Sequence, residues 1–239
     1  VAAHRDRVYA AVSLLEVRFG GLPAERTLRV PEYETAARTT LMFGSRPETR
    51  SCIPTLIAPD CTPWRYRNAE DGVGIDRTFY APVAHEELER YAAAVPEDFR
   101  FIVKAYSGIT TDPESGRGVR QADAAEVFLD AAFATREVIA PLTRALRQRL
   151  GAVLFQFSPL SAHYLRAPET FAARVGEFLE ALPQGVPYTV EMRDPEVLVP
   201  AYEAALRAGR ASHCSSVHSR MPSVDTQPIG SEEAPQVIR

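Results

Sequence analysis

Cysteine and long apolar runs are both scarce in this chain of 239 residues. Its three cysteines include no Cys-x-x-Cys pair, and an odd number is a poor basis for a disulfide framework. No apolar run approaches the roughly 20 residues that a membrane-spanning helix needs. We therefore expect a cytoplasmic protein with no membrane association.

Net positive charge is also missing. The formal net charge is −4 and the isoelectric point is about 5.8. Proteins that coat nucleic acid release counterions through a basic face or a basic total. The acidic total therefore disfavours a nucleic-acid partner, which would need a local basic pocket.

Lysine is the rarest charged residue. Of the 27 lysine and arginine residues, only Lys104 is a lysine. A GC-rich genome, whose codons favour arginine, explains the depletion but not the one lysine that remains. Arginine cannot lose its proton near neutral pH, attack a carbonyl group or fit a compact ammonium into a small space. Lys104 is therefore predicted to be functional, with chance as the alternative.

From about residue 72 onward, short apolar runs alternate with amphipathic stretches. This alternation of strands and helices is typical of a parallel sheet with helical crossovers, and both an open sheet and a closed barrel satisfy it. The predicted strands are residues 73–76, 101–104, 152–157, 188–192 and, more weakly, 211–216. The predicted helices are residues 86–94, 124–138 with a second turn after Pro141 that runs to 150, 171–182 and 197–208.

Polar side chains occupy the last inward-facing position of four of these strands. Residues two apart share a face, so Asp76, Lys104, Gln156 and Glu191 are predicted to face one side, with Arg193 just beyond. In α/β proteins ligands bind at the C-terminal strand ends, because the loops after the strands open there. We predict a polar pocket in which Glu191 balances Lys104 and Arg193. The alternative is that strand ends are polar because they approach solvent.

Metal-binding residue types occur near the C-terminus, at His213, Cys214 and His218. Their spacing matches neither a zinc finger nor a helical pair, so no metal site is predicted. No cofactor is predicted either, because the chain has no Gly-rich phosphate loop and no Gly-x-Ser-x-Gly elbow. We interpret His218 and Arg220 as substrate-binding residues at the rim of the pocket.

Five motifs occur in order along the chain. They are Val-Gly-Ile-Asp-Arg-Thr-Phe-Tyr-Ala-Pro (73–82), Val-Pro-Glu-Asp-Phe-Arg-Phe-Ile-Val-Lys (95–104), Val-Leu-Phe-Gln-Phe-Ser-Pro (153–159), Val-Glu-Met-Arg-Asp (190–194) and Val-His-Ser-Arg-Met-Pro (217–222). Together they resemble the YecE-like family, the domain of unknown function numbered 72, over about residues 72–227. The resemblance implies a TIM-type barrel. It supplies no reaction.

Both ends of the chain depart from this resemblance. Relatives open with a strand carrying Gly-Thr-Ser-x-Trp, which does not follow Val17-Arg-Phe-Gly20 here. We interpret residues 1–71 as an atypical N-terminal segment, with 21–71 from a shifted reading frame or a divergent replacement, and expect proteolysis to cut there first. Relatives also continue past Gln227. The predicted fold is therefore a parallel (β/α) TIM-type barrel domain over residues 72–239, incomplete at both ends.

The predicted function is an enzyme, a hydrolase or a lyase, acting on a small anionic or phosphorylated substrate. Arg193 would clamp an oxyanion through its planar fork. Lys104 would be a base, an electrophile or a Schiff-base former, with Glu191 and Asp76 moving protons or orienting it. The neutral contacts to the substrate are predicted to be Gln156, Tyr80 and Thr78.

Two other functions stay open. In a nucleic-acid-related barrel, the same cations would receive a phosphate while Tyr80 or Phe79 stacks on a base. In a non-catalytic or degenerate binding protein, which the unusual chain ends favour, the pocket would bind without reacting. The sequence does not indicate an oligomeric state.

Overall fold

The computed structural model describes residues 72–95, 97, 99–116, 126–231 and 233–238, together with the backbone of a short strand, β1 (Glu16–Arg18). The predictions for residues 1–71, namely an atypical segment, a shifted reading frame over 21–71 and early proteolysis, lie outside the described residues apart from β1. They stay predictions.

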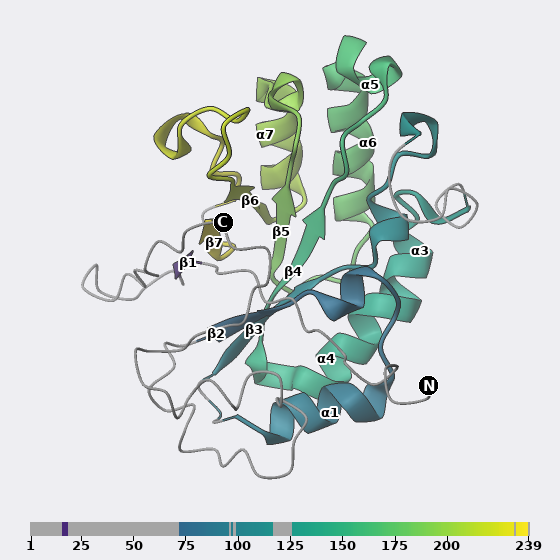
Figure 1. Ribbon diagram of the computed structural model, residues 1–239, viewed down its shortest axis with the longest axis vertical. Helices are drawn as coiled ribbons and strands as arrows, with labels where there is room; N and C mark the ends of the chain where they lie inside the picture. Colours follow the sequence, from purple (N-terminus) through teal and green to yellow (C-terminus); the bar gives the residue numbers. More distant parts are fainter. Residues whose placement is uncertain are drawn as a thin grey trace, which may run out of the picture.

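Five parallel strands form the centre of the fold (Figure 1). They are β2 (Gly72–Ile75), β3 (Arg100–Lys104), β4 (Leu150–Gln156), β5 (Tyr188–Glu191) and β6 (Ala211–Ser215), hydrogen-bonded to one another in that order. The prediction that the strands at 73–76, 101–104, 152–157 and 188–192 are parallel neighbours is therefore confirmed. Because the strands are parallel, their C-terminal ends meet at one edge of the sheet.

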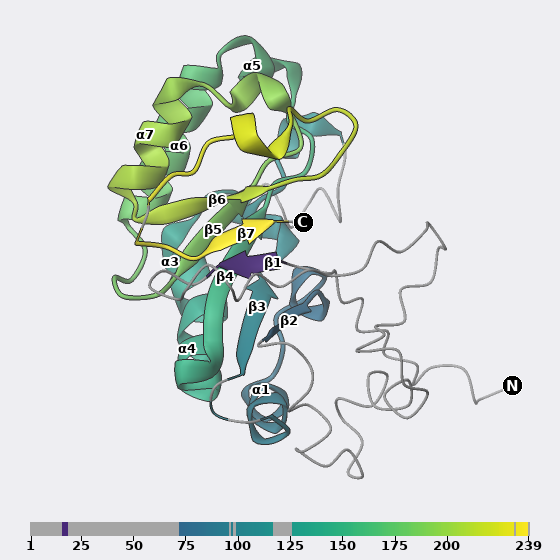
Figure 2. The same ribbon diagram turned by 90° about the vertical axis from the view of Figure 1, so that its left-hand side faces the viewer.

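A further strand lies near the end of the chain. β7 (Gln236–Ile238) pairs in parallel with the end of β6 and antiparallel with β1, so the full order is β1-β7-β6-β5-β4-β3-β2 (Figure 2). Three residues are too few to show an alternation of apolar and polar side chains. β7 is a strand because it pairs with β6 and β1. β1 and β2 are the two ends of this order, and the closed barrel stays a prediction.

The two faces of the parallel sheet contact different cores. β4 is buried along its whole length, as expected of an apolar strand covered on both faces. On one face, Phe101 and Val103 pack with the helices in the large core. The other face carries a small apolar cluster of Ile102, Ala152, Leu154, Cys214 and Val237. By strand parity, Lys104, Gln156 and Glu191 share this second face, beyond its apolar part.

Helices complete the large core. α1 (His85–Ala93) packs against α4 (Ala140–Leu146), and α6 (Pro168–Glu180) packs against α7 (Pro200–Ala208) (Figure 2). The short α5 (Ala162–Arg166) precedes α6. α6 and α7 each start at a proline, where the missing N–H has no helical partner to lose. The predicted helices 171–182 and 197–208 are therefore found, but α6 begins and ends earlier than predicted and α7 begins later. None of the described helices is long and apolar enough to cross a membrane.

The predicted helix over 124–150 is not regular in its described part. It comprises α3 (Ala131–Phe133), a π-helical segment (Ala134–Ile139), α4 and a 3₁₀ turn (Arg147–Arg149). Pro141, in the first turn of α4, has no N–H to donate to the turn before it, so the regular hydrogen-bond ladder is interrupted there. The change predicted at Pro141 is thus found, but α4 begins one residue before it and residue 150 already belongs to β4.

Candidate functional site

Lys104 and Asp76 meet at the C-terminal ends of β3 and β2. The Nζ atom of Lys104 lies 2.9 Å from Oδ1 of Asp76, and the two side chains are 8% and 9% exposed. The ring of Phe79 covers the ammonium, with its centroid 5.6 Å from Nζ, which is within cation–π range. Burying a charge is costly unless it is paired, so the carboxylate and the ring together make this position tolerable for lysine.

Glu191, at the end of β5, joins the next two polar side chains. The Nε2 atom of Gln156 donates a hydrogen bond of 2.7 Å to Oε2 of Glu191. An Arg193 Nη2 atom lies 3.0 Å from Oε1, and the side chains of Glu191 and Arg193 are 1% and 32% exposed. Arg193 therefore reaches from a buried carboxylate to the surface.

These five residues form what we call the charged cluster: Asp76, Lys104, Gln156, Glu191 and Arg193. The register places them at neighbouring strand ends, because Gln156 lies opposite Glu191 and Lys104 lies opposite Leu154, two residues before Gln156. Glu191 forms the predicted ion pair with Arg193, whereas the ion pair of Lys104 is with Asp76. The structure thus forms two ion pairs, one at the ends of β2 and β3 and one at the end of β5, with Gln156 of β4 hydrogen-bonded to the second.

Thr78 and Tyr80, both predicted to bind substrate, lie in and after the 3₁₀ turn η3 (Arg77–Phe79) that follows β2. The Thr78 hydroxyl is buried and donates to the Lys104 carbonyl at 2.6 Å, with the Ile75 carbonyl at 3.2 Å. Tyr80 is 61% exposed and contacts Phe79 edge to face. Thr78 therefore interacts with the protein backbone, while Tyr80 is accessible from solvent.

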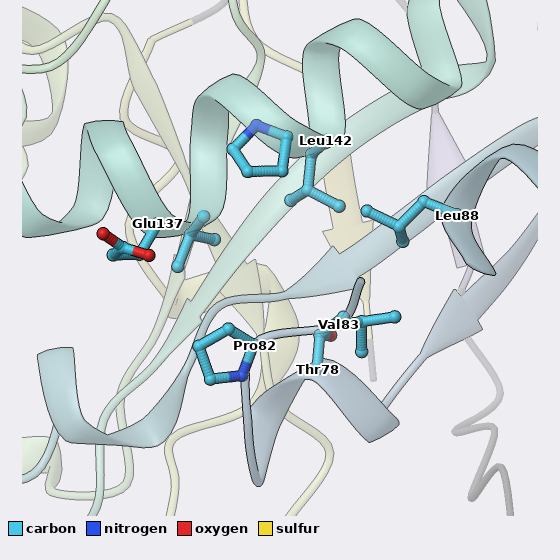
Figure 3. Close-up of a pocket in the computed structure, with 8 residues that line it drawn as sticks. Thr78, Pro82, Val83, Leu88, Glu137 and Leu142 are labelled. Atoms are coloured by element: carbon cyan, nitrogen blue, oxygen red, sulfur yellow. The ribbon is translucent and has the colours of Figure 1, made fainter. Parts of the chain in front are cut away.

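A small cavity lies behind Thr78, on the helical side of β2 and β3 (Figure 3). It encloses about 10 Å³, enough for about one water molecule. Its walls are mostly apolar and come from the turn after β2, α1 and the π-helical segment with α4. The lining residues are Thr78, Pro82, Val83, Leu88, Glu137, Val138, Pro141 and Leu142. This cavity is not the polar pocket predicted around Lys104, which stays a prediction.

A second polar group, which we call the histidine network, lies between β6 and α7. The Tyr202 hydroxyl is 3.1 Å from Nδ1 of His213, and Nε2 of His213 is 3.1 Å from Oε1 of Gln227. The amide oxygen of Gln227 also accepts from the Ser216 N–H, so His213 donates from Nε2 and accepts at Nδ1. Burial lowers the pKa of His213 to about 4 and raises that of Tyr202 well above its usual value. The network is therefore neutral at ordinary pH.

The residues weighed as metal ligands point in different directions. His213 faces α7 and uses both ring nitrogens, whereas Cys214 belongs to the apolar cluster on the opposite face. Within the described residues, no group of three His, Cys, Asp or Glu side chains is arranged to hold a metal ion. His218 and Arg220 are exposed, and the Arg220 N–H donates a hydrogen bond of 3.2 Å to Nδ1 of His218. The place of these two residues at the rim of the pocket stays a prediction.

Two buried carboxylates near the site were missed in the sequence. Asp194 Oδ2 accepts from the Leu160 N–H at 2.7 Å, and Asp112 Oδ2 accepts from the Ser161 N–H at 2.8 Å. Both therefore hold the loop after β4, one from the loop after β5 and one from the loop after β3. Each aspartate directly precedes a proline, and Asp-Pro pairs are typical of turns. This pair was the sequence feature that could have indicated their role in holding a loop.

Comparison with known proteins gives a family. Two crystal structures of a DUF72 family protein from Enterococcus faecalis V583 are similar to this chain: one is 24% identical with a TM-score of 0.45, and the other is 21% identical with a TM-score of 0.42. The matches cover 70% of this chain and 62% and 57% of those chains, so this chain spans less than two thirds of their length. No curated protein matches. The sequence model of the family described as "Protein of unknown function DUF72" matches residues 65–237, which is most of the chain and confirms the resemblance drawn from the motifs. The chain therefore belongs to the DUF72 family.

Proposed function

We propose that the charged cluster binds a small anionic or phosphorylated molecule at the C-terminal mouth of a (β/α) barrel, and that the protein is an enzyme that moves a proton there. The observation that carries this proposal is the Lys104–Asp76 ion pair, 2.9 Å long and more than nine-tenths buried at the strand ends. An ammonium and a carboxylate in contact can give and take a proton, as the acid–base steps of hydrolases and lyases require.

Each side chain of the cluster has a role in this proposal. Arg193, the most exposed member, meets the anionic group of the ligand first through its planar fork. Lys104 provides the second positive charge and can donate a proton to the ligand, while Asp76 orients the ammonium and can accept a proton from the ligand. Glu191 holds Arg193, and Gln156 holds Glu191.

The charges also limit the ligand. The two cations of the cluster are matched by two carboxylates, so an entering anion must compete with Asp76 or Glu191 for its cation. A ligand with one anionic group and neutral hydrogen-bonding groups fits this arrangement better than a polyphosphate. Exposed Tyr80, beside Phe79, supplies an aromatic surface at the edge of the site.

The test measures binding of inorganic phosphate, and of small phosphorylated and carboxylated compounds, to the parent protein and to Lys104→Arg and Lys104→Met. Loss of binding in both variants, with folding intact, supports a role that charge alone cannot fill. The control is Arg207→Met, which removes an exposed cation paired with Glu203 on α7. If Lys104→Arg binds like the parent, Lys104 serves only as a charge and its proposed proton transfer is wrong.

A nucleic-acid role is the second candidate, because Tyr80 could stack on a base beside the same cations. Binding of a short single-stranded oligonucleotide is measured over a salt series. Steep weakening with salt favours phosphate-backbone contacts and the nucleic-acid role. Absence of oligonucleotide binding, with phosphate binding retained, leaves the small-molecule enzyme. Binding of neither probe would contradict both phosphate-binding roles and favour a degenerate protein.

A further inference from the structure

The turn after β2, residues 76–79, surrounds Lys104. Asp76 pairs with its ammonium and Phe79 covers the same ammonium with its ring. Thr78, between them, reaches the backbone instead: its hydroxyl donates to the Lys104 carbonyl at 2.6 Å. Three of the four residues of this turn therefore contact the one lysine of the chain.

The fourth residue of the turn attaches it to α1. Arg77 contacts Oε1 of Glu87, and the Tyr91 hydroxyl donates to that same oxygen at 2.9 Å. Burial, followed by the hydrogen bond to Glu87, raises the pKa of Tyr91 to about 12, so its hydroxyl stays a donor. Through Arg77 the turn is fixed to a helix that is itself packed on the core.

We propose that Thr78 is a positioning residue for Lys104. Its hydroxyl has one hydrogen, which the short bond to the Lys104 carbonyl uses. The hydroxyl thus joins the end of β3 to the turn that carries Asp76 and Phe79, and sets the ammonium between carboxylate and ring. The inference rests on the proposed function, in which Lys104 meets the ligand, and it gives Thr78 an indirect role in place of direct contact with substrate.

The hydroxyl and the methyl group of Thr78 have different surroundings, so two substitutions can test them separately. Besides its hydrogen bond, Thr78 lines the small apolar cavity with Val83, Leu88 and Leu142 (Figure 3). Thr78→Val keeps the volume against this cavity and removes the hydroxyl. Thr78→Ser keeps the hydroxyl and removes the methyl group. A purely structural residue is more sensitive to lost packing, whereas a positioning residue is more sensitive to the lost hydroxyl.

Because the chain has a single lysine, isotope-labelled lysine gives one side-chain NMR signal, from Lys104. In the full chain we expect an ordered ammonium in the parent and in Thr78→Ser, and a mobile one in Thr78→Val and in Asp76→Asn. Phosphate affinity should fall about fivefold in Thr78→Val, as expected for one lost neutral hydrogen bond, and less than twofold in Thr78→Ser.

An ordered parent-like ammonium in Thr78→Val would overturn the positioning role. Should Thr78→Val not fold, Thr78→Ala is compared with Thr78→Ser, because both lack the methyl group and only Thr78→Ala lacks the hydroxyl. Phosphate binding and ammonium order separate the two proposals. A parent that binds no phosphate refutes the proposed ligand, while its lysine signal still decides whether Thr78 positions the ammonium.

Discussion

The charged cluster and the histidine network are both buried polar groups of the same sheet, but they differ in charge and in how they are satisfied. The histidine network is neutral, and each nitrogen and oxygen of its His213 and Gln227 side chains has a partner in the protein. The charged cluster contains four ionisable side chains in two ion pairs, one of which reaches solvent through Arg193.

This difference distinguishes a structural role from a functional one. A neutral, fully hydrogen-bonded network fixes local structure, here the loop of residues 216–227 against β6. A buried ion pair often stabilises a fold less than apolar side chains of similar volume would. Two such pairs at the strand ends therefore agree with the proposed ligand binding.

The largest expected effect comes from breaking the charged cluster at its most buried member. Glu191→Ala should lower the free energy of unfolding by about 4 kcal/mol, because Gln156 loses its acceptor and Arg193 its carboxylate. Urea unfolding measures the change, and Glu196→Ala, at an exposed position, is the control. A loss below about 1 kcal/mol would mean that the cluster rearranges freely and is not preorganised.

The contribution of the histidine network to the free energy of unfolding should depend on pH. The unfolded chain protonates His213 near pH 6.5, whereas the folded protein does so near pH 4, so the unfolded state binds more protons between these values. Stability should therefore fall by about 3 kcal/mol as the pH drops from about 6.5 to about 4. Unfolding of the parent and of His213→Gln is compared at each pH, to subtract other titrating groups. Equal slopes for both proteins would refute this assignment.

Removing the Tyr202 hydroxyl tests whether its hydrogen bond to His213 contributes to stability. Tyr202→Phe leaves Nδ1 of His213 without its donor, and should cost about 1–2 kcal/mol of unfolding free energy. Thermal and urea unfolding report the change. Tyr80→Phe removes a hydroxyl from an exposed ring and should change nothing measurable. If the two variants behave alike, Tyr202 contributes through its ring alone.

The smallest stability effect is expected at the rim of the charged cluster. Tyr80→Ala should change the free energy of unfolding by less than about 0.5 kcal/mol, because the side chain is mostly exposed. Binding of phosphate or of an oligonucleotide is measured in parallel. Weaker oligonucleotide binding with unchanged phosphate binding would identify Tyr80 as a stacking residue.

The sequence predicted what depends on local pattern. Strand parity placed Gln156 and Glu191 on one face, and they are hydrogen-bonded. Alternation of strands and helices predicted the parallel sheet. The pattern did not show that Lys104 forms an ion pair with Asp76, because that contact depends on the turn after β2. Nor did it show β7, whose pairing partners lie at distant positions.

The charged cluster is assembled from strands that are far apart in the chain: the Gln156–Glu191 bond spans 35 positions, and the Thr78–Lys104 bond that joins the turn after β2 to β3 spans 26. Contacts of such long range form late in folding, because long loops must close first. A partly folded chain therefore contains no complete site. By linkage, a ligand that binds only the complete site would stabilise the folded stretch from β2 to β5, and a change that leaves part of this stretch unfolded would weaken binding in proportion to the unfolded fraction.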